Sequence, residues 1–193
     1  MNLPPEEQAR ANFYALLSRL FYAAPDAALL AALGSADELE ADDEIIAQRW
    51  RELSRAAAAA DPEAVREEYE TAFVGTGRAP ITLYTSAYSV KYTNEMPLAP
   101  LRGELAALGL ARRNEAAEPE DHIAALCDAM RHLIAEQQRD LEEQRRFFER
   151  WIQPIAEPLC DAIEKSEHTS FYKLVGRMAK AFFSLEHSAF EML

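Results

Sequence analysis

The chain has 193 residues and carries 33 acidic against 20 basic side chains, which gives a formal net charge of −13 at pH 7. This negative charge disfavours binding to the phosphate backbone of nucleic acids and to anionic membrane surfaces, and it favours a basic partner. The N-terminal residues have neither the basic region nor the apolar core of a signal peptide, and no apolar run approaches the about 20 residues that span a bilayer. We therefore expect a single domain over residues 1–193, in the cytoplasm and without stable membrane insertion.

Apolar residues recur at helical spacing in the N-terminal part of the chain, which predicts amphipathic helices. The first stripe consists of Phe13, Leu16, Leu17, Leu20 and Phe21, and the second of Ile45, Ile46, Trp50 and Leu53. Asp61 followed by Pro62 is typical of a helix start, because aspartate can cap a helix and proline has no amide hydrogen to satisfy. This third helix is predicted to continue through Val65 and Tyr69 to Phe73.

The middle of the chain is predicted to alternate between loops and short helices. Residues 74–83 contain two glycines and a proline, which predicts a flexible loop. Tyr84, Tyr88 and Tyr92 follow at intervals of four, which predicts a short helix with the three phenols on one side. A further helix is expected over residues 100–108, ended by Gly109, and a hinge-like loop over residues 110–118.

The C-terminal part is predicted to contain the longest helix, beginning at Pro119, and a strongly amphipathic last helix. The buried face of the first is marked by Leu126, Met130, Leu133, Ile134 and Leu141, and that of the second by Phe171, Leu174, Val175, Met178, Phe182 and Leu185. Pro154 and Pro158 predict a break or a kink near Gln153. No segment shows the alternation of a β-strand, so the predicted fold class is all-α.

The segment 118–122 reads Glu-Pro-Glu-Asp-His and leads directly into an apolar-periodic run. Proline and acidic residues suit a helix start, because the positive end of the helix dipole attracts negative charge. A histidine directly after an aspartate exceeds that structural need. It places two polar groups where a loop meets a helix and where a ligand could reach both.

Signatures of enzymes and metal sites are missing from the sequence. It has no phosphate-binding glycine loop, no nucleophile elbow, no His-Glu-x-x-His and no Cys-x-x-Cys, and none of its four histidines has a glutamate three residues earlier. Cys127 and Cys160 lie in helical apolar patterns, as expected of reduced core thiols. We therefore predict no catalytic residue, no metal and no enzymatic activity.

Several segments, taken in order, resemble the TorD/DmsD/NarJ family of redox-enzyme maturation chaperones. They are Tyr-Glu-Thr-Ala-Phe-Val-Gly at 69–75, Tyr-Thr-Ser-Ala-Tyr at 84–88, Glu-Pro-Glu-Asp-His at 118–122, Phe-Phe-x-x-Trp at 147–151 and Phe-Tyr-Lys-Leu at 171–174. The resemblance covers residues 10 to 190 approximately. It implies a single-domain helical bundle of the TorD-like type.

The resemblance also implies a function: binding the twin-arginine signal peptide of a molybdenum-cofactor enzyme, and its catalytic subunit, until the cofactor is inserted. The implied peptide-binding residues are Phe73, Gly75, Leu83, Tyr84, Ser86, Tyr88, Glu118, Pro119, Asp121 and His122. Carboxylates beside apolar walls suit a peptide that has paired arginines and an apolar segment. The resemblance implies no tightly bound cofactor and at most weak guanine nucleotide binding, in a monomer or homodimer.

Two positions depart from the family pattern. Ala72 stands where the family commonly has leucine, and Thr82-Leu83 stands where it has consecutive prolines. The loop is therefore expected to hold a different peptide, or to hold one differently. Two other functions stay open: a general helical adaptor for another basic partner, and a nucleotide-binding or nucleotide-hydrolysing protein, which the absence of a phosphate loop disfavours.

Overall fold

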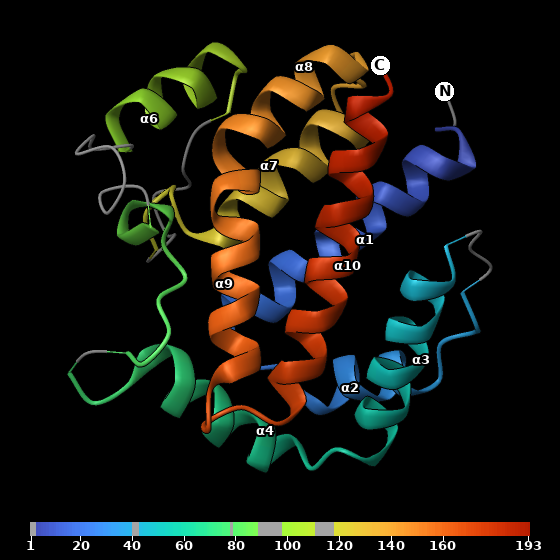
Figure 1. Ribbon diagram of the computed structural model, residues 1–193, viewed down its shortest axis with the longest axis vertical. Helices are drawn as coiled ribbons and strands as arrows, with labels where there is room; N and C mark the ends of the chain where they lie inside the picture. Colours follow the sequence, from blue (N-terminus) through green and yellow to red (C-terminus); the bar gives the residue numbers. More distant parts are fainter. Residues whose placement is uncertain (1–2, 40–42, 78, 89–97, 111–117) are drawn as a thin grey trace. The chain divides into compact units, whose positions relative to one another are not determined.

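The computed structural model describes residues 3–39, 43–77, 79–88, 98–110 and 118–193 (Figure 1). These residues form helices, and their only bridge between extended segments is an isolated antiparallel one between Tyr84 and His122, so the all-α prediction is confirmed. The α-helices are α1 (Pro5–Tyr22), α2 (Ala27–Gly34), α3 (Glu44–Ala59), α4 (Pro62–Tyr69), α6 (Leu98–Ala107), α7 (Ile123–Ala135), α8 (Leu141–Phe147), α9 (Gln153–Lys165) and α10 (Phe171–Glu191), and the π-helices are η1 (Glu70–Val74) and η2 (Phe148–Ile152).

Backbone packing groups the chain into two compact units, each built from separate stretches of sequence. The first unit comprises residues 1–22, 83–155 and 190–193, and the second comprises residues 23–82 and 156–189. The expectation of one domain over residues 1–193 stays a prediction. Among the helices of the described ranges, none combines the length and the apolar character that crossing a bilayer requires.

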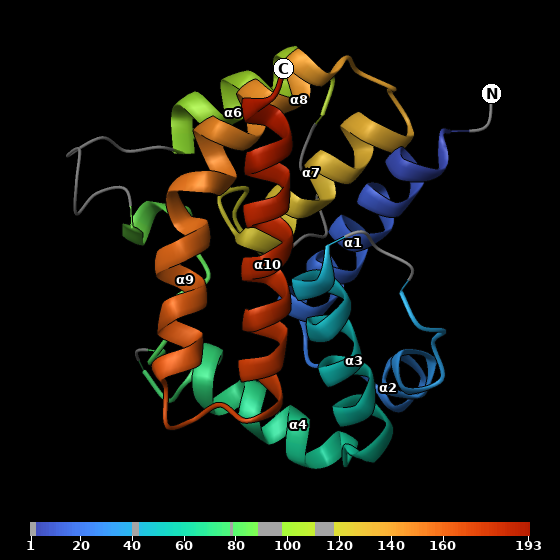
Figure 2. The ribbon, with the colours of Figure 1, turned by 45° about the vertical axis from the view of Figure 1, so that its right-hand side comes forward.

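The core of the first unit is the contact between α1 and α7, which lie beside each other (Figure 2). Leu17 and Leu20 of the predicted stripe are fully buried there, and so is Tyr14, which the stripe did not include. From α7, Leu126 and Met130 are fully buried. Because fully burying such a side chain contributes about 1.5–3 kcal/mol, these residues add substantially to the unit's stability.

The second unit contains the α2–α3 pair and the facing parts of α9 and α10. Gly34 at the end of α2 comes so close to α3 that a Cβ atom built on it would lie 2.7 Å from the Cα of Ala58. The predicted stripe of α3 is confirmed at Ile46 and Leu53, but Ile45 is 60% exposed. Ile45 lies in the first turn, whose amides are capped by the Asp43 carboxylate.

α10 begins on a carboxylate that belongs to another helix. Glu68 of α4 accepts the backbone N–H groups of Ser170, Phe171 and Tyr172, at 2.8, 3.1 and 2.7 Å for the shortest contact of each. The first amides of a helix have no partner within it, so Glu68 satisfies groups that would otherwise need water or a local cap. This single side chain therefore ties α4 to the start of α10 within the second unit.

The predicted long helix from Pro119 is wrong at both ends. α7 begins at Ile123 with His122 as its cap and ends at Ala135, and Pro119 lies in the preceding turn. A new helix, α8, begins at Leu141 because the Asp140 carboxylate caps the Glu143 amide, at 2.8 Å. Leu141, predicted to be buried, is 40% exposed at that helix start. The longest described helix is α10, with 21 residues.

Other expectations have mixed outcomes. The prediction of a helix break near Gln153 is wrong: residues 141–165 stay helical without a gap, and near Gln153 only the helix type changes, from η2 to α9, with Pro158 inside α9. α6 and the following Gly109, with φ 73°, agree with the helix expected over residues 100–108. Leu185 is 39% exposed and so lies off the buried face of α10. Tyr92 and most of the hinge-like loop, residues 111–117, lie outside the described residues.

Candidate functional site

Two segments far apart in the sequence pair in the first unit. The Thr85 N–H donates to the Asp121 carbonyl oxygen, at 2.9 Å, and the Ile123 N–H donates to the Leu83 carbonyl oxygen, also at 2.9 Å. Tyr84 lies between Leu83 and Thr85, and His122 lies between Asp121 and Ile123. These two residues form the antiparallel bridge. The structure thus brings the start of the aromatic segment at 84–88 next to the acidic segment at 118–122. That the two form one peptide-binding site stays a prediction.

Asp121 is buried, with 3% of its surface exposed, and its groups hold the neighbouring segment. One carboxylate oxygen accepts the Ser86 N–H at 3.2 Å, and the carbonyl oxygen accepts the Thr85 hydroxyl at 3.0 Å. Residues 85–88 are helical, so the carboxylate satisfies an amide of their first turn. Asp121 therefore positions the aromatic segment through bonds made inside the protein.

His122 is the N-cap of α7 and is also buried. Its Nδ1 accepts the Ala124 N–H at 3.1 Å, and its ring meets the Tyr84 ring edge to face, with centroids 5.1 Å apart. A nitrogen that accepts a hydrogen bond carries no proton, so the ring is neutral with its proton on Nε2. Burial lowers the pKa of His122, although the carboxylates of Glu118 and Asp121 oppose this shift.

Tyr84 and Glu118 form the more accessible part of the site. The half-buried Tyr84 hydroxyl donates to the Glu118 carboxylate. Burial, and secondly the hydrogen bond to Glu118, raise the pKa of Tyr84 to about 12. The phenol therefore stays protonated at neutral pH and keeps Glu118 against the ring that also contacts His122.

Glu120 binds an arginine from α6 in a two-pronged geometry. The Nε and one terminal nitrogen of Arg102 each lie 3.0 Å from a different carboxylate oxygen of Glu120. The Glu120 side chain is 13% exposed and that of Arg102 is 52% exposed, so the pair lies at the surface. This pairing was not predicted, because a single arginine on a short helix gives no sequence signal of its partner.

The remaining predicted site residues differ in their surroundings. Ser86, Tyr88 and Pro119 are half-buried in the first unit, while Leu83 is 3% exposed and thus faces the interior. Phe73 and Gly75 belong to the second unit. Neither Leu83 nor Phe73, which is 8% exposed, presents much apolar surface to a ligand.

Phe73 lies in an aromatic cluster of the second unit. Its ring centroid is 5.2 Å from that of Tyr69 and 4.9 Å from that of Tyr172. Gly75 follows with φ 65°, a conformation that favours glycine, and ends η1. Ala72, which departs from the family pattern, is fully buried. Its carbonyl oxygen accepts the Ile81 N–H at 3.0 Å, and this hydrogen bond closes the loop after η1.

The sequence model of the nitrate reductase delta subunit family matches residues 39–161, which is more than half of the chain. The chain belongs to the nitrate reductase delta subunit family. This membership confirms the family resemblance predicted from the segments at 69–75, 84–88 and 118–122. A comparison with curated proteins finds no match. In the described part of this family member, no group of three or more His, Cys, Asp and Glu side chains is arranged to hold a metal ion.

Proposed function

We propose that this chain is a non-catalytic maturation chaperone for the catalytic subunit of a molybdenum-cofactor oxidoreductase, and that it binds the twin-arginine signal peptide of that subunit in the cytoplasm before export. Membership of the nitrate reductase delta subunit family supports the general role in enzyme maturation. The acidic segment at 118–122 and the net charge of −13 support a basic peptide as the bound partner.

The observation that carries the proposal is the Arg102–Glu120 pair. Glu120 already holds a guanidinium group through two parallel hydrogen bonds, which is the geometry that distinguishes arginine from lysine. Arg102 is half exposed, so water can replace it and an incoming arginine can take its place on Glu120. Beneath this surface, Asp121 and His122 hold the segment in position.

The proposal is tested by calorimetry with two synthetic peptides that differ only in having paired arginines or paired lysines before an apolar segment. The arginine peptide is expected to bind roughly tenfold tighter, because only arginine can form both hydrogen bonds with one carboxylate. The variant Glu120→Gln should lose most of this preference, since it no longer offers two charged oxygens.

Glu136→Gln is the matched control. Glu136 also binds an arginine, Arg131, but at the exposed end of α7. This variant removes the same charge and should bind both peptides as the wild type does. Equal binding of the two peptides by the wild-type protein would contradict the proposed function and favour an adaptor for basic partners in general.

A further inference from the structure

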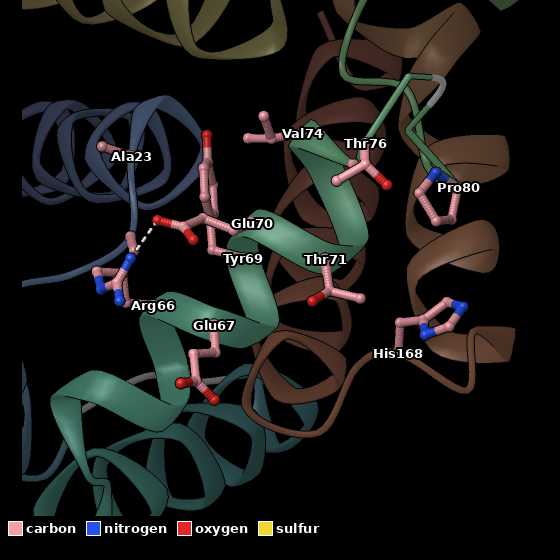
Figure 3. A pocket seen from close by; sticks show the side chains of 12 residues that line it. Ala23, Arg66, Glu67, Tyr69, Glu70, Thr71, Val74, Thr76, Pro80 and His168 are labelled. Atoms are coloured by element: carbon pink, nitrogen blue, oxygen red, sulfur yellow. Dashed lines mark hydrogen bonds and ion pairs between the residues drawn. The ribbon is translucent and has the colours of Figure 1, made fainter.

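The second unit contains a pocket. The carboxylates predicted to bind the peptide, Glu118 and Asp121, do not line it. Its volume is about 1000 Å³, and its walls come from α4, η1, the start of the loop after η1, the segment before α2 and the turn before α10 (Figure 3). Its lining includes Arg66, Glu67, Tyr69, Glu70, Val74 and His168.

The pocket lies along the outer face of α4 and η1. Glu67, Glu70, Thr71 and Val74 follow one another at helical spacing and are all exposed. Val65 and Phe73 are buried, and Tyr69, which also lines the pocket, is only 9% exposed. The outer face is polar except at Val74, whose surface is 58% exposed. Val74 therefore gives an otherwise polar face an apolar contact point, directly before the left-handed turn at Gly75.

The charges around the pocket are unevenly matched. Arg66 forms ion pairs with both Glu63 and Glu70, and the latter pair is drawn in Figure 3. Glu67 has no ion-pair or hydrogen-bond partner for its carboxylate among the described residues. Among the described residues that line the pocket there are thus two carboxylates, those of Glu67 and Glu70, for the one guanidinium of Arg66. A cation could bind Glu67 without displacing any pair formed by the described residues.

Apart from Tyr69, the apolar part of the wall is formed by small or short side chains. Ala23, Ala24, Val74 and Pro80 contribute to it, together with the methyl groups of the threonines. These side chains leave room for a larger apolar side chain of a ligand. The π-helix η1, which ends at Val74, supports a binding role further, because such short π-segments often occur at functional sites.

We propose that this pocket binds an apolar segment of the client's signal peptide next to a basic side chain, with Val74 contacting the apolar residues and Glu67 pairing with the cation. The inference rests on the proposed function, because it names a second contact made by the same partner. A peptide with basic residues and an apolar stretch has the two chemical features that the pocket offers.

The test measures the affinity of a fluorescent peptide with two adjacent arginines followed by about ten apolar residues. Val74→Lys is expected to weaken binding roughly tenfold, because it replaces an apolar contact by a positive charge. Ile45→Lys is the matched control: Ile45 is also β-branched, is 60% exposed in the same unit and does not line the pocket. It adds the same charge and should leave the affinity unchanged.

Glu67→Gln tests the cation contact. It should weaken binding about threefold at low salt and less at high salt, as expected for an exposed ion pair. Glu157→Gln, an exposed glutamate of α9 outside the pocket, is its control. Circular dichroism of each variant shows whether the helices remain folded.

The outcomes separate this inference from the proposed function. If the wild-type protein prefers the arginine peptide to the lysine peptide but Val74→Lys and Ile45→Lys bind alike, the pocket inference is overturned and the proposed function stands. If Val74→Lys alone weakens binding, and replacing the apolar segment of the peptide by a Gly-Ser segment does so too, the pocket is confirmed. Loss of the arginine preference in the wild type contradicts the proposed function itself.

Discussion

The starts of α7 and α10 are stabilised in different ways. In α7 the Ala124 amide is capped by the side chain of the adjacent residue, His122, whereas the first amides of α10 bind Glu68, which precedes Ser170 by 102 residues. The partner of a local cap lies only a few residues away, so the sequence around the helix start contains both groups, although the prediction placed this start at Pro119. A distant carboxylate is brought to the helix start only by folding. The two helix starts therefore show that equal needs for hydrogen bonds can be met at very different distances along the chain.

The largest loss of stability is expected when Glu68, the distant cap of α10, is replaced. Glu68→Ala should lower the free energy of unfolding by about 3 kcal/mol, because three backbone amides lose a charged acceptor. Urea unfolding followed by circular dichroism measures this change. The neighbouring exposed variant Glu67→Ala should change it by less than about 0.5 kcal/mol. Equal effects of the two variants would show that Glu68 adds nothing to the start of α10.

A smaller loss is predicted where Asp121 holds the aromatic segment. Asp121→Ala should reduce the free energy of unfolding by about 1.5 kcal/mol, since the Ser86 N–H loses its acceptor. Asp121→Asn keeps one acceptor oxygen and should recover part of this loss in the same urea experiment. If alanine and asparagine variants were equally unstable, the hydrogen bond to Ser86 would not be the cause.

The local cap should depend on pH. The neutral ring of His122 is favoured in the folded state, so its contribution is complete above the unfolded pKa near 6.5 and is lost as the pH falls from there through the lower folded pKa. His122→Asn keeps a good cap without a titrating group. As the pH falls from about 7 to 5, the melting temperature of the wild type should therefore drop relative to that of His122→Asn. Parallel pH profiles would contradict the assignment of Nδ1 as the acceptor.

The smallest effect on stability is predicted for the surface ion pair between Arg102 and Glu120. Arg102→Gln should leave the melting temperature almost unchanged, because exposed ion pairs contribute little. Its effect should appear in binding: affinity for the twin-arginine peptide should rise about threefold, since Glu120 no longer binds an arginine of its own chain. Arg131→Gln removes the same charge elsewhere in the first unit and should not raise the affinity. A lower affinity in Arg102→Gln would mean that Arg102 positions Glu120 for binding.

The helices themselves were largely predictable. Stripes such as that of α1 recur at a spacing that only a helix places on one side, and Gly109 marks the end of α6 as its conformational freedom suggests. The predicted helix from Pro119 was wrong because periodicity alone does not show where caps interrupt it. The side chains of His122 and Asp140 make bonds that end one segment and start the next.

Some of the predicted site residues are buried and others are accessible, and the sequence did not reveal which. In the motif at 118–122, a histidine directly after an aspartate exceeds the needs of a helix start. The structure gives both of these residues internal partners, while Glu120, the residue between proline and aspartate, binds an arginine at the surface. Adjacent residues of a motif point in different directions, so their order does not show which of them a ligand can reach.

The sequence by itself determined the all-α class, the family and the presence of an acidic and an aromatic segment, because composition, helical spacing and motif order can be read directly along the chain. Only the tertiary structure decided that Tyr84 pairs with His122, that Glu68 caps α10 and that the outer face of α4 and η1 lines a pocket. These features depend on contacts between residues far apart in sequence. Packing forms such contacts, and no local pattern encodes them.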